Sequence, residues 1–88
     1  MKLNKNFVLR RVAGAHMVMP LGQATVNFDG MLKLNDSGAL LWKALKDGAD
    51  LDGLVTTLTG EYDVSEAQAR ADVQEFLEKL AKAGCLEM

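Results

Sequence analysis

The hydrophobic pattern of this chain changes its period near Asn35, and this change constrains the fold more than any other feature. Before Asn35, residues 24–28 alternate between apolar and polar side chains, which is the signature of a half-buried strand. After it, the apolar residues within 51–58 recur at spacings of three and four, which places them on one face of a helix. A strand-forming first part followed by a helical second part predicts an α+β fold.

The first part predicts a small N-terminal antiparallel sheet of three or four strands. Short apolar runs are separated by residue pairs that suit tight hairpin turns, namely Ala13-Gly14, Gly22-Gln23 and Asp29-Gly30. The expected strands are Phe7–Val12, His16–Leu21, Ala24–Phe28 and Met31–Leu34. Pro20 cannot donate a ladder hydrogen bond, so we expect it at a strand end or a bulge.

The second part predicts three helices, and each has recognisable ends. The candidate N-caps are Asn35, Asp36 or Ser37 for the first helix, Asp50 for the second and Ser65 for the third. Gln68 follows Ser65 by three residues and completes a capping box. Glycines end the three helices at Gly48, Gly60 and Gly84. Two short helices and a long one beside a small sheet outline a winged helix-turn-helix-like single domain over residues 1–88.

The composition argues against an enzyme. A chain of 88 residues with 49% hydrophobic residues can build one core, but a deep substrate cavity inside it would be hard to accommodate. His16 is the only histidine and Cys85 the only cysteine, so no disulfide can form within the chain, and no third group is marked to orient a catalytic pair. No zinc spacing, phosphate-binding loop or dinucleotide fingerprint is present. We therefore expect no catalysis, cofactor or metal.

Charge and targeting signals limit the partners. Residues 1–35 contain five basic residues and one acidic residue, whereas residues 36–88 contain five basic and eleven acidic residues. The third helix, within 65–84, has three basic and four acidic residues, and DNA binding requires a cationic surface. A winged-helix DNA-binding transcriptional regulator is therefore the alternative function and not the preferred one. The chain lacks a signal peptide and a membrane-spanning stretch, so we expect a cytoplasmic protein with no nucleic-acid or membrane partner.

Several short segments, taken in their order and spacing, carry a family resemblance. They are Gly30–Asn35, Gly38–Leu45, Glu61–Val64, and the third-helix residues Asp72, Val73, Phe76, Leu77, Leu80 and Gly84. Together they resemble the PqqD-like family, the group of pyrroloquinoline quinone biosynthesis protein D, from about Phe7 to Leu86. One feature departs from the family pattern: the alternation at Ala24–Phe28 suggests an extra strand and leaves the order of the sheet open.

The resemblance implies a non-catalytic chaperone for peptide modification. Family members recognise the leader of a ribosomally synthesised precursor peptide and present it to a modifying enzyme, commonly a radical S-adenosylmethionine maturase. The leader adds as a further strand beside the last strand of the sheet, in a groove closed by the third helix. Such strand addition uses backbone groups and needs no catalytic residue. The chain itself is expected to be a monomer or a homodimer.

Applied to this sequence, the resemblance places the peptide between the last strand and the third helix. Leu32 and Leu34 should face the helices, while Met31 and Lys33 should point away. On the third helix, Phe76 and Leu80 are expected to lean inward, whereas Val73 and Leu77 are expected to face the groove. Basic residues should lie at the rim of the groove. The predicted peptide-binding residues are Met31, Leu32, Lys33, Leu34, Arg70, Val73 and Leu77.

Overall fold

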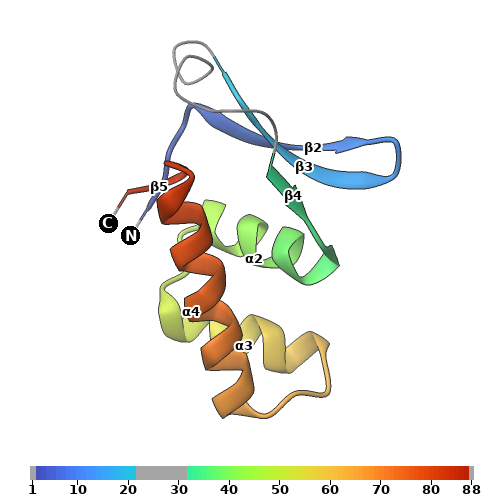
Figure 1. Ribbon diagram of the computed structural model, residues 1–88. Helices are drawn as coiled ribbons and strands as arrows, with labels where there is room; N and C mark the ends of the chain where they lie inside the picture. Colours follow the sequence, from blue (N-terminus) through green and yellow to red (C-terminus); the bar gives the residue numbers. More distant parts are fainter. Residues whose placement is uncertain (1, 22–31, 88) are drawn as a thin grey trace.

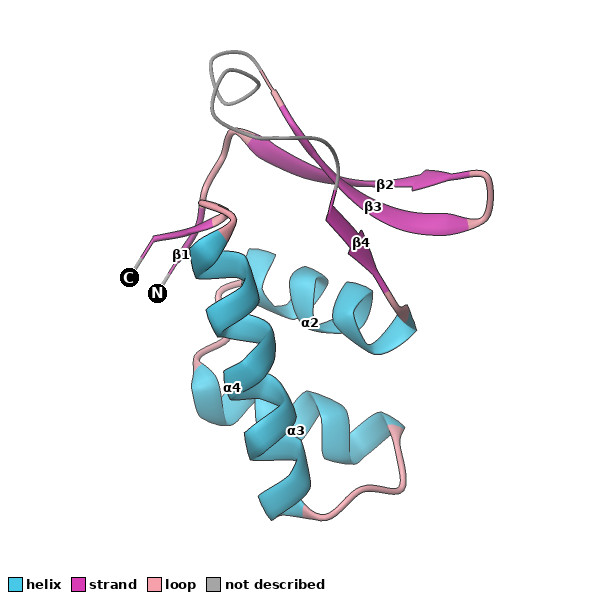
Figure 2. Ribbon diagram, in the orientation of Figure 1, coloured by secondary structure: helices cyan, strands magenta, loops and turns pink. Residues whose placement is uncertain are grey.

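A computed structural model describes residues 2–21 and 32–87 and confirms the α+β fold, with a small antiparallel sheet followed by helices (Figures 1 and 2). The sheet lies along one side of the helical part, nearest to α2. In chain order the elements are β1 (Lys2–Leu3), β2 (Phe7–Val12), β3 (Ala15–Pro20), β4 (Leu32–Leu34), α2 (Asp36–Lys46), α3 (Leu51–Glu61), α4 (Glu66–Lys82) and β5 (Leu86–Glu87).

The main sheet is an antiparallel meander in the order β2-β3-β4. Ala13 and Gly14 connect β2 to β3 with φ angles of 51° and 81°, the left-handed conformations that a type I′ hairpin turn requires. Pro20 is the last residue of β3, as expected for a residue without an N–H. The predicted strand Ala24–Phe28 and the two predicted turns beside it lie outside the described residues.

A second, two-stranded sheet joins the chain ends and was not predicted. β1 pairs with β5 in the register Lys2↔Glu87 and Leu3↔Leu86, and the N–H of Asn4 donates to the carbonyl of Cys85 over 2.8 Å. Figure 1 shows the two termini side by side as a result. Strands of two residues are too short to produce a detectable alternation, so the sequence carries no signal for them.

The helices begin where their capping residues predict. The side chains of Asn35, Asp50 and Ser65 accept hydrogen bonds from the backbone N–H three residues later, over 2.8, 2.8 and 3.1 Å. The capping box at Ser65 forms only in this direction, because the side-chain amide of Gln68 donates instead to Asp72 over 2.9 Å. These caps fix the start of each helix relative to the loop before it.

The predicted end of α3 at Gly60 is wrong by one residue. The helix continues to Glu61, and the N–H of Tyr62 still donates to the carbonyl of Leu58 over 2.9 Å. Gly60 does not adopt a positive φ, whereas Gly48 and Gly84, just beyond α2 and α4, do. A glycine ends a helix only where the chain takes the left-handed conformation, and here the extended backbone of Tyr62 ends it instead.

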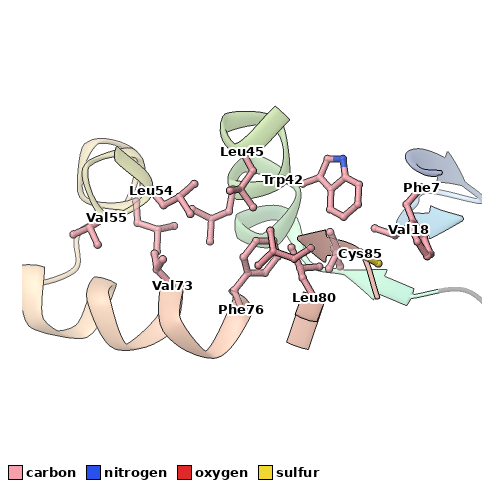
Figure 3. Packing of buried hydrophobic residues seen from close by; sticks show 14 of the residues in the cluster. Phe7, Val18, Trp42, Leu45, Leu54, Val55, Val73, Phe76, Leu80 and Cys85 are labelled. Atoms are coloured by element: carbon pink, nitrogen blue, oxygen red, sulfur yellow. The ribbon is translucent and has the colours of Figure 1, made fainter. Parts of the chain in front are cut away.

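The core lies between the helices and the inner face of the main sheet. Figure 3 shows Trp42 on α2 pointing toward Val18 and Phe7 of the sheet, and Val73 of α4 pointing toward Leu54 of α3. Trp42 is 3% exposed and therefore anchors α2 in the core. The other buried hydrophobic residues of this cluster are Leu34, Leu41, Leu45, Val55, Leu58, Ala69, Phe76, Leu80, Cys85 and Leu86.

Candidate functional site

The described residues form a surface cleft of about 690 Å³ between β4 and α4. The start of α2 and the end of α3 close its remaining sides. Its lining residues are Lys33, Leu34, Asn35, Ser37, Gly38, Leu41, Leu58, Tyr62, Val64, Asp72, Glu75, Phe76 and Lys79. The cleft therefore lies between the last strand of the main sheet and the longest helix.

The cleft has an apolar interior and a charged rim. Its buried apolar lining consists of Leu34, Leu41, Leu58 and Phe76. Tyr62 lines one side with 42% of its surface exposed. The exposed rim residues Lys33, Lys79, Asp72 and Glu75 carry two positive and two negative charges. An apolar concavity with a few charged groups at its edge is typical of a binding site.

Strand β4 forms one wall of the cleft and is an edge of the main sheet. Among the described strands it pairs only with β3, through His16↔Leu34, Met17↔Lys33 and Val18↔Leu32. In an antiparallel edge strand, alternate residues direct their N–H and C=O groups away from the neighbouring strand. Those groups can pair with an added strand, so β4 supplies a template for an extended peptide.

Close packing of α2 against β4 fixes the position of this edge. A Cβ atom on Gly38 would lie 3.3 Å from Cβ of Leu34 and 3.1 Å from Oδ1 of Asn35, so the absence of a side chain allows the approach. A second link joins the sheet to α2, since Nε2 of His16 lies 3.1 Å from Oδ1 of Asp36. His16 is thus half-buried in its strand and has Asp36 as its partner.

The predicted strand residues occupy the positions expected of them, so far as the structure describes them. Leu34 is buried in the core and Leu32 packs against it, while Lys33 is exposed. Lys33 and Leu34 both line the cleft. Met31 lies outside the described residues.

The expectation that Val73 faces the groove is wrong. Its side chain is fully buried and points toward Leu54 of α3 (Figure 3). Phe76, which the sequence assigned to the core alone, is 9% exposed and lines the cleft. Both residues lie on the buried stripe of α4, but Val73 meets α3 and is enclosed, whereas Phe76 reaches the cleft.

Arg70 and Leu77 do not line the cleft either. Arg70 donates to Asp52 of α3 over 3.0 Å and lies 3.6 Å from Glu66, and the hydrogen bond to Asp52 is the main cause of its raised pKa. Leu77 is half-buried and packs against the core. At about 100° per residue, both lie on the side of the buried stripe opposite to the cleft residues of α4. Arg70 is therefore committed to an ion pair away from the proposed rim.

The sequence reasoning missed the cleft residues of α4, although a signal for them exists. Asp72, Glu75, Phe76 and Lys79 follow the spacing of one helix face, but only Phe76 is apolar, so a search for an apolar stripe passes over the other three. Tyr62 was also missed as a site residue. It lies in the turn after α3, where no periodicity distinguishes a wall from an ordinary loop residue.

The nucleophilic and metal-binding candidates give no catalytic arrangement among the described residues. Cys85 is fully buried, and burial raises the pKa of its thiol to about 11, so the thiol is neutral near pH 7. In the described ranges 2–21 and 32–87, no group of three or more histidine, cysteine or acidic residues is placed to hold a metal ion. No helix in the same ranges is both long and apolar enough to cross a membrane.

Comparison with known proteins gives one family and two similar structures. The model of the family described as Coenzyme PQQ synthesis protein D (PqqD) matches residues 8–86. The structure of TbiB1 in complex with the TbiA(beta) leader peptide is 23% identical, with a TM-score of 0.81, and the match covers 99% of this chain and 95% of that one. The structure of lasso peptide synthetase B1 complexed with the leader peptide is also 23% identical, with a TM-score of 0.78 over 96% and 93% of the two chains. No curated protein sequence matches the chain.

Proposed function

Because this chain belongs to the Coenzyme PQQ synthesis protein D family, we propose that it binds the leader segment of a precursor peptide in the cleft between β4 and α4. The leader would add as a strand beside β4, and its apolar side chains would enter the cleft. The domain performs no chemistry of its own. It presents the bound precursor to a modifying enzyme in the cytoplasm, and the family resemblance favours a radical S-adenosylmethionine maturase.

The observation that carries the proposal is the edge strand itself, which borders an apolar cleft. β4 has three residues, and an added strand beside it can form about two to four ladder hydrogen bonds. At about 0.5–1.5 kcal/mol each, these bonds supply roughly 1–6 kcal/mol, less than the ~8 kcal/mol of micromolar binding. Apolar contacts must provide the remainder, and the cleft offers them next to the strand.

Three apolar side chains are the proposed contacts for the leader. Phe76 lines the cleft from α4 and Leu34 from β4, and Tyr62 adds a partly exposed aromatic residue. The rim would then select for charge, because Lys79 can attract an acidic leader residue while Glu75 can attract a basic one. Rim charges of this kind affect the association rate and the specificity more than the affinity.

The similar structures support the same proposal. Both are of proteins in complex with leader peptides, and each match covers more than 90% of this chain and of the other. At 23% identity they support a shared fold, and the edge strand and cleft of this chain supply the argument for a shared mode of binding.

The test is a titration of the isotope-labelled domain with the leader of a precursor peptide encoded beside its gene. We expect saturable binding, with amide shifts concentrated in residues 32–38 and 72–79. A scrambled leader of the same composition is the control and should bind at least tenfold more weakly. Absence of binding to the neighbouring leaders, or shifts restricted to other surfaces, would refute the proposal.

A further inference from the structure

We propose that the outer face of the main sheet is a docking surface for an acidic, partly apolar surface of the modifying enzyme. This inference rests on the proposed function in one respect, namely that the partner is the enzyme that receives the peptide. The surface itself follows from strand alternation, burial and charge.

Strand alternation defines the two faces of the sheet. Phe7, Leu9, Val18, Leu32 and Leu34 belong to the core or pack against it, so they mark the inner face. Successive side chains of a strand point to opposite faces. The outer face therefore carries Val8, Arg10 and Val12 from β2, Ala15, Met17 and Met19 from β3, and Lys33 from β4.

The outer face combines apolar side chains with positive charge. The strand register places Val8 opposite Met19, and Met17 lies between Arg10 and Lys33 in neighbouring strands. Val12, near the hairpin turn, is 41% exposed although apolar. The described strands of this sheet contain Arg10, Arg11 and Lys33 and no acidic residue. Val8, Met17 and Met19 are partly buried, and flexible methionines beside the exposed Val12 are suited to a protein partner.

Charge complementarity selects the partner. The outer face is not self-complementary, because its described residues offer no carboxylate to meet Arg10 or Lys33 of a second copy. A nucleic acid would also meet the positive charges, but Val8, Met17 and Met19 on the same face offer nothing to a phosphate backbone. A protein surface with apolar side chains inside a rim of Asp and Glu satisfies both features.

The position of Lys33 connects this face to the cleft. Its backbone belongs to the edge strand β4, it stands beside Met17 on the outer face, and it also borders the cleft. An enzyme bound to the outer face would therefore meet the peptide where it leaves the edge of the sheet. The domain would hold the leader at the edge of β4 and the enzyme on the outer face of the sheet.

The experiment measures binding of the full domain to the purified modifying enzyme encoded beside its gene, with leader affinity measured in parallel. The test variants are Arg10→Glu and Met17→Glu, both on the outer face and outside the lining of the cleft. Lys46→Glu is the matched control, since it reverses an exposed positive charge in the last turn of α2. We expect each test variant to weaken enzyme binding at least tenfold, with unchanged leader affinity, and the control to bind normally. Added salt should weaken the wild type more than Arg10→Glu.

Several outcomes would overturn the docking surface, and one would overturn only the proposed function. Enzyme binding within twofold of wild type for both test variants would do so, as would an equal loss for Lys46→Glu. Failure of the wild type to bind the enzyme while it binds the leader would refute this surface and leave the peptide site intact. Failure to bind the leader, with enzyme binding that still depends on Arg10, would refute the proposed function alone. Salt-sensitive binding of duplex DNA, or self-association, that both test variants abolish would assign the face to another partner.

Discussion

Replacing Tyr62 with serine should reduce leader affinity without harming the fold. The backbone of Tyr62 caps α3 whatever the side chain, because its N–H donates to the carbonyl of Leu58. Tyr62 is 42% exposed and lines the cleft, so a bound peptide can cover about 80 Å² of a residue whose burial involves 150–250 Å². At about 25 cal/mol per Å² this area is worth roughly 2 kcal/mol, or about 30-fold in Kd.

Leu21→Ser is the matched control for this experiment. Leu21 is apolar and 45% exposed, close to the value for Tyr62, but it does not line the cleft. Leader affinity is measured by calorimetry, and folding is followed separately by the fluorescence of Trp42, which reports on the core. We expect a loss of about 30-fold for Tyr62→Ser and less than twofold for Leu21→Ser. Equal effects of the two substitutions, or an unchanged Kd for Tyr62→Ser, would refute the assignment of Tyr62 to the peptide site.

Three further predictions concern stability and the face of α4. The raised pKa of Cys85 favours the neutral thiol in the folded state, so its contribution to the free energy of unfolding is complete below pH 9 and is lost as the pH rises from about 9 to about 11. Urea titrations should therefore show a smaller alkaline loss of stability for Cys85→Ala than for the wild type, and an equal dependence of stability on pH would contradict this. Ala13→Asn should raise the free energy of unfolding by about 1 kcal/mol, because Asn tolerates the left-handed conformation that Ala13 adopts, and a destabilised variant would argue against the type I′ turn. Leu77→Ala should lower the free energy of unfolding by about 1–2 kcal/mol and leave leader affinity of the folded protein unchanged, because Leu77 packs against the core away from the cleft; a selective loss of affinity would return Leu77 to the site.

Local signals in the sequence were sufficient to predict the helices and the first hairpin. Asn35, Asp50 and Ser65 act through hydrogen bonds to N–H groups three residues away, so their effect can be read from a short window. The hairpin at Ala13-Gly14 is equally local. The pairing of β1 with β5 joins the two ends of the chain, and two-residue strands leave no periodic trace of it.

The side of α4 that faces the cleft could not be predicted, because it depends on how three helices cross. The apolar stripe identifies the buried direction of the helix, and Val73, Phe76 and Leu80 all lie on it. Sequence spacing does not indicate which edge of the stripe meets α3 and which meets β4. In the structure Arg70 reaches across to Asp52 of α3, and the opposite edge, with Asp72 and Glu75, is left at the cleft.

The proposed peptide site also lacks a motif for a physical reason. Strand addition depends on backbone N–H and C=O groups, which every residue except proline provides, so an edge strand such as β4 places few demands on side-chain identity. What the site requires is that β4 be held at the border of an apolar cleft. Gly38 permits the close approach of α2, Leu34 anchors the strand in the core, and the pairing with β3 fixes its register. These residues resemble ordinary packing residues in the sequence, and only their arrangement around β4, an edge among the described strands, gives them the proposed role in binding.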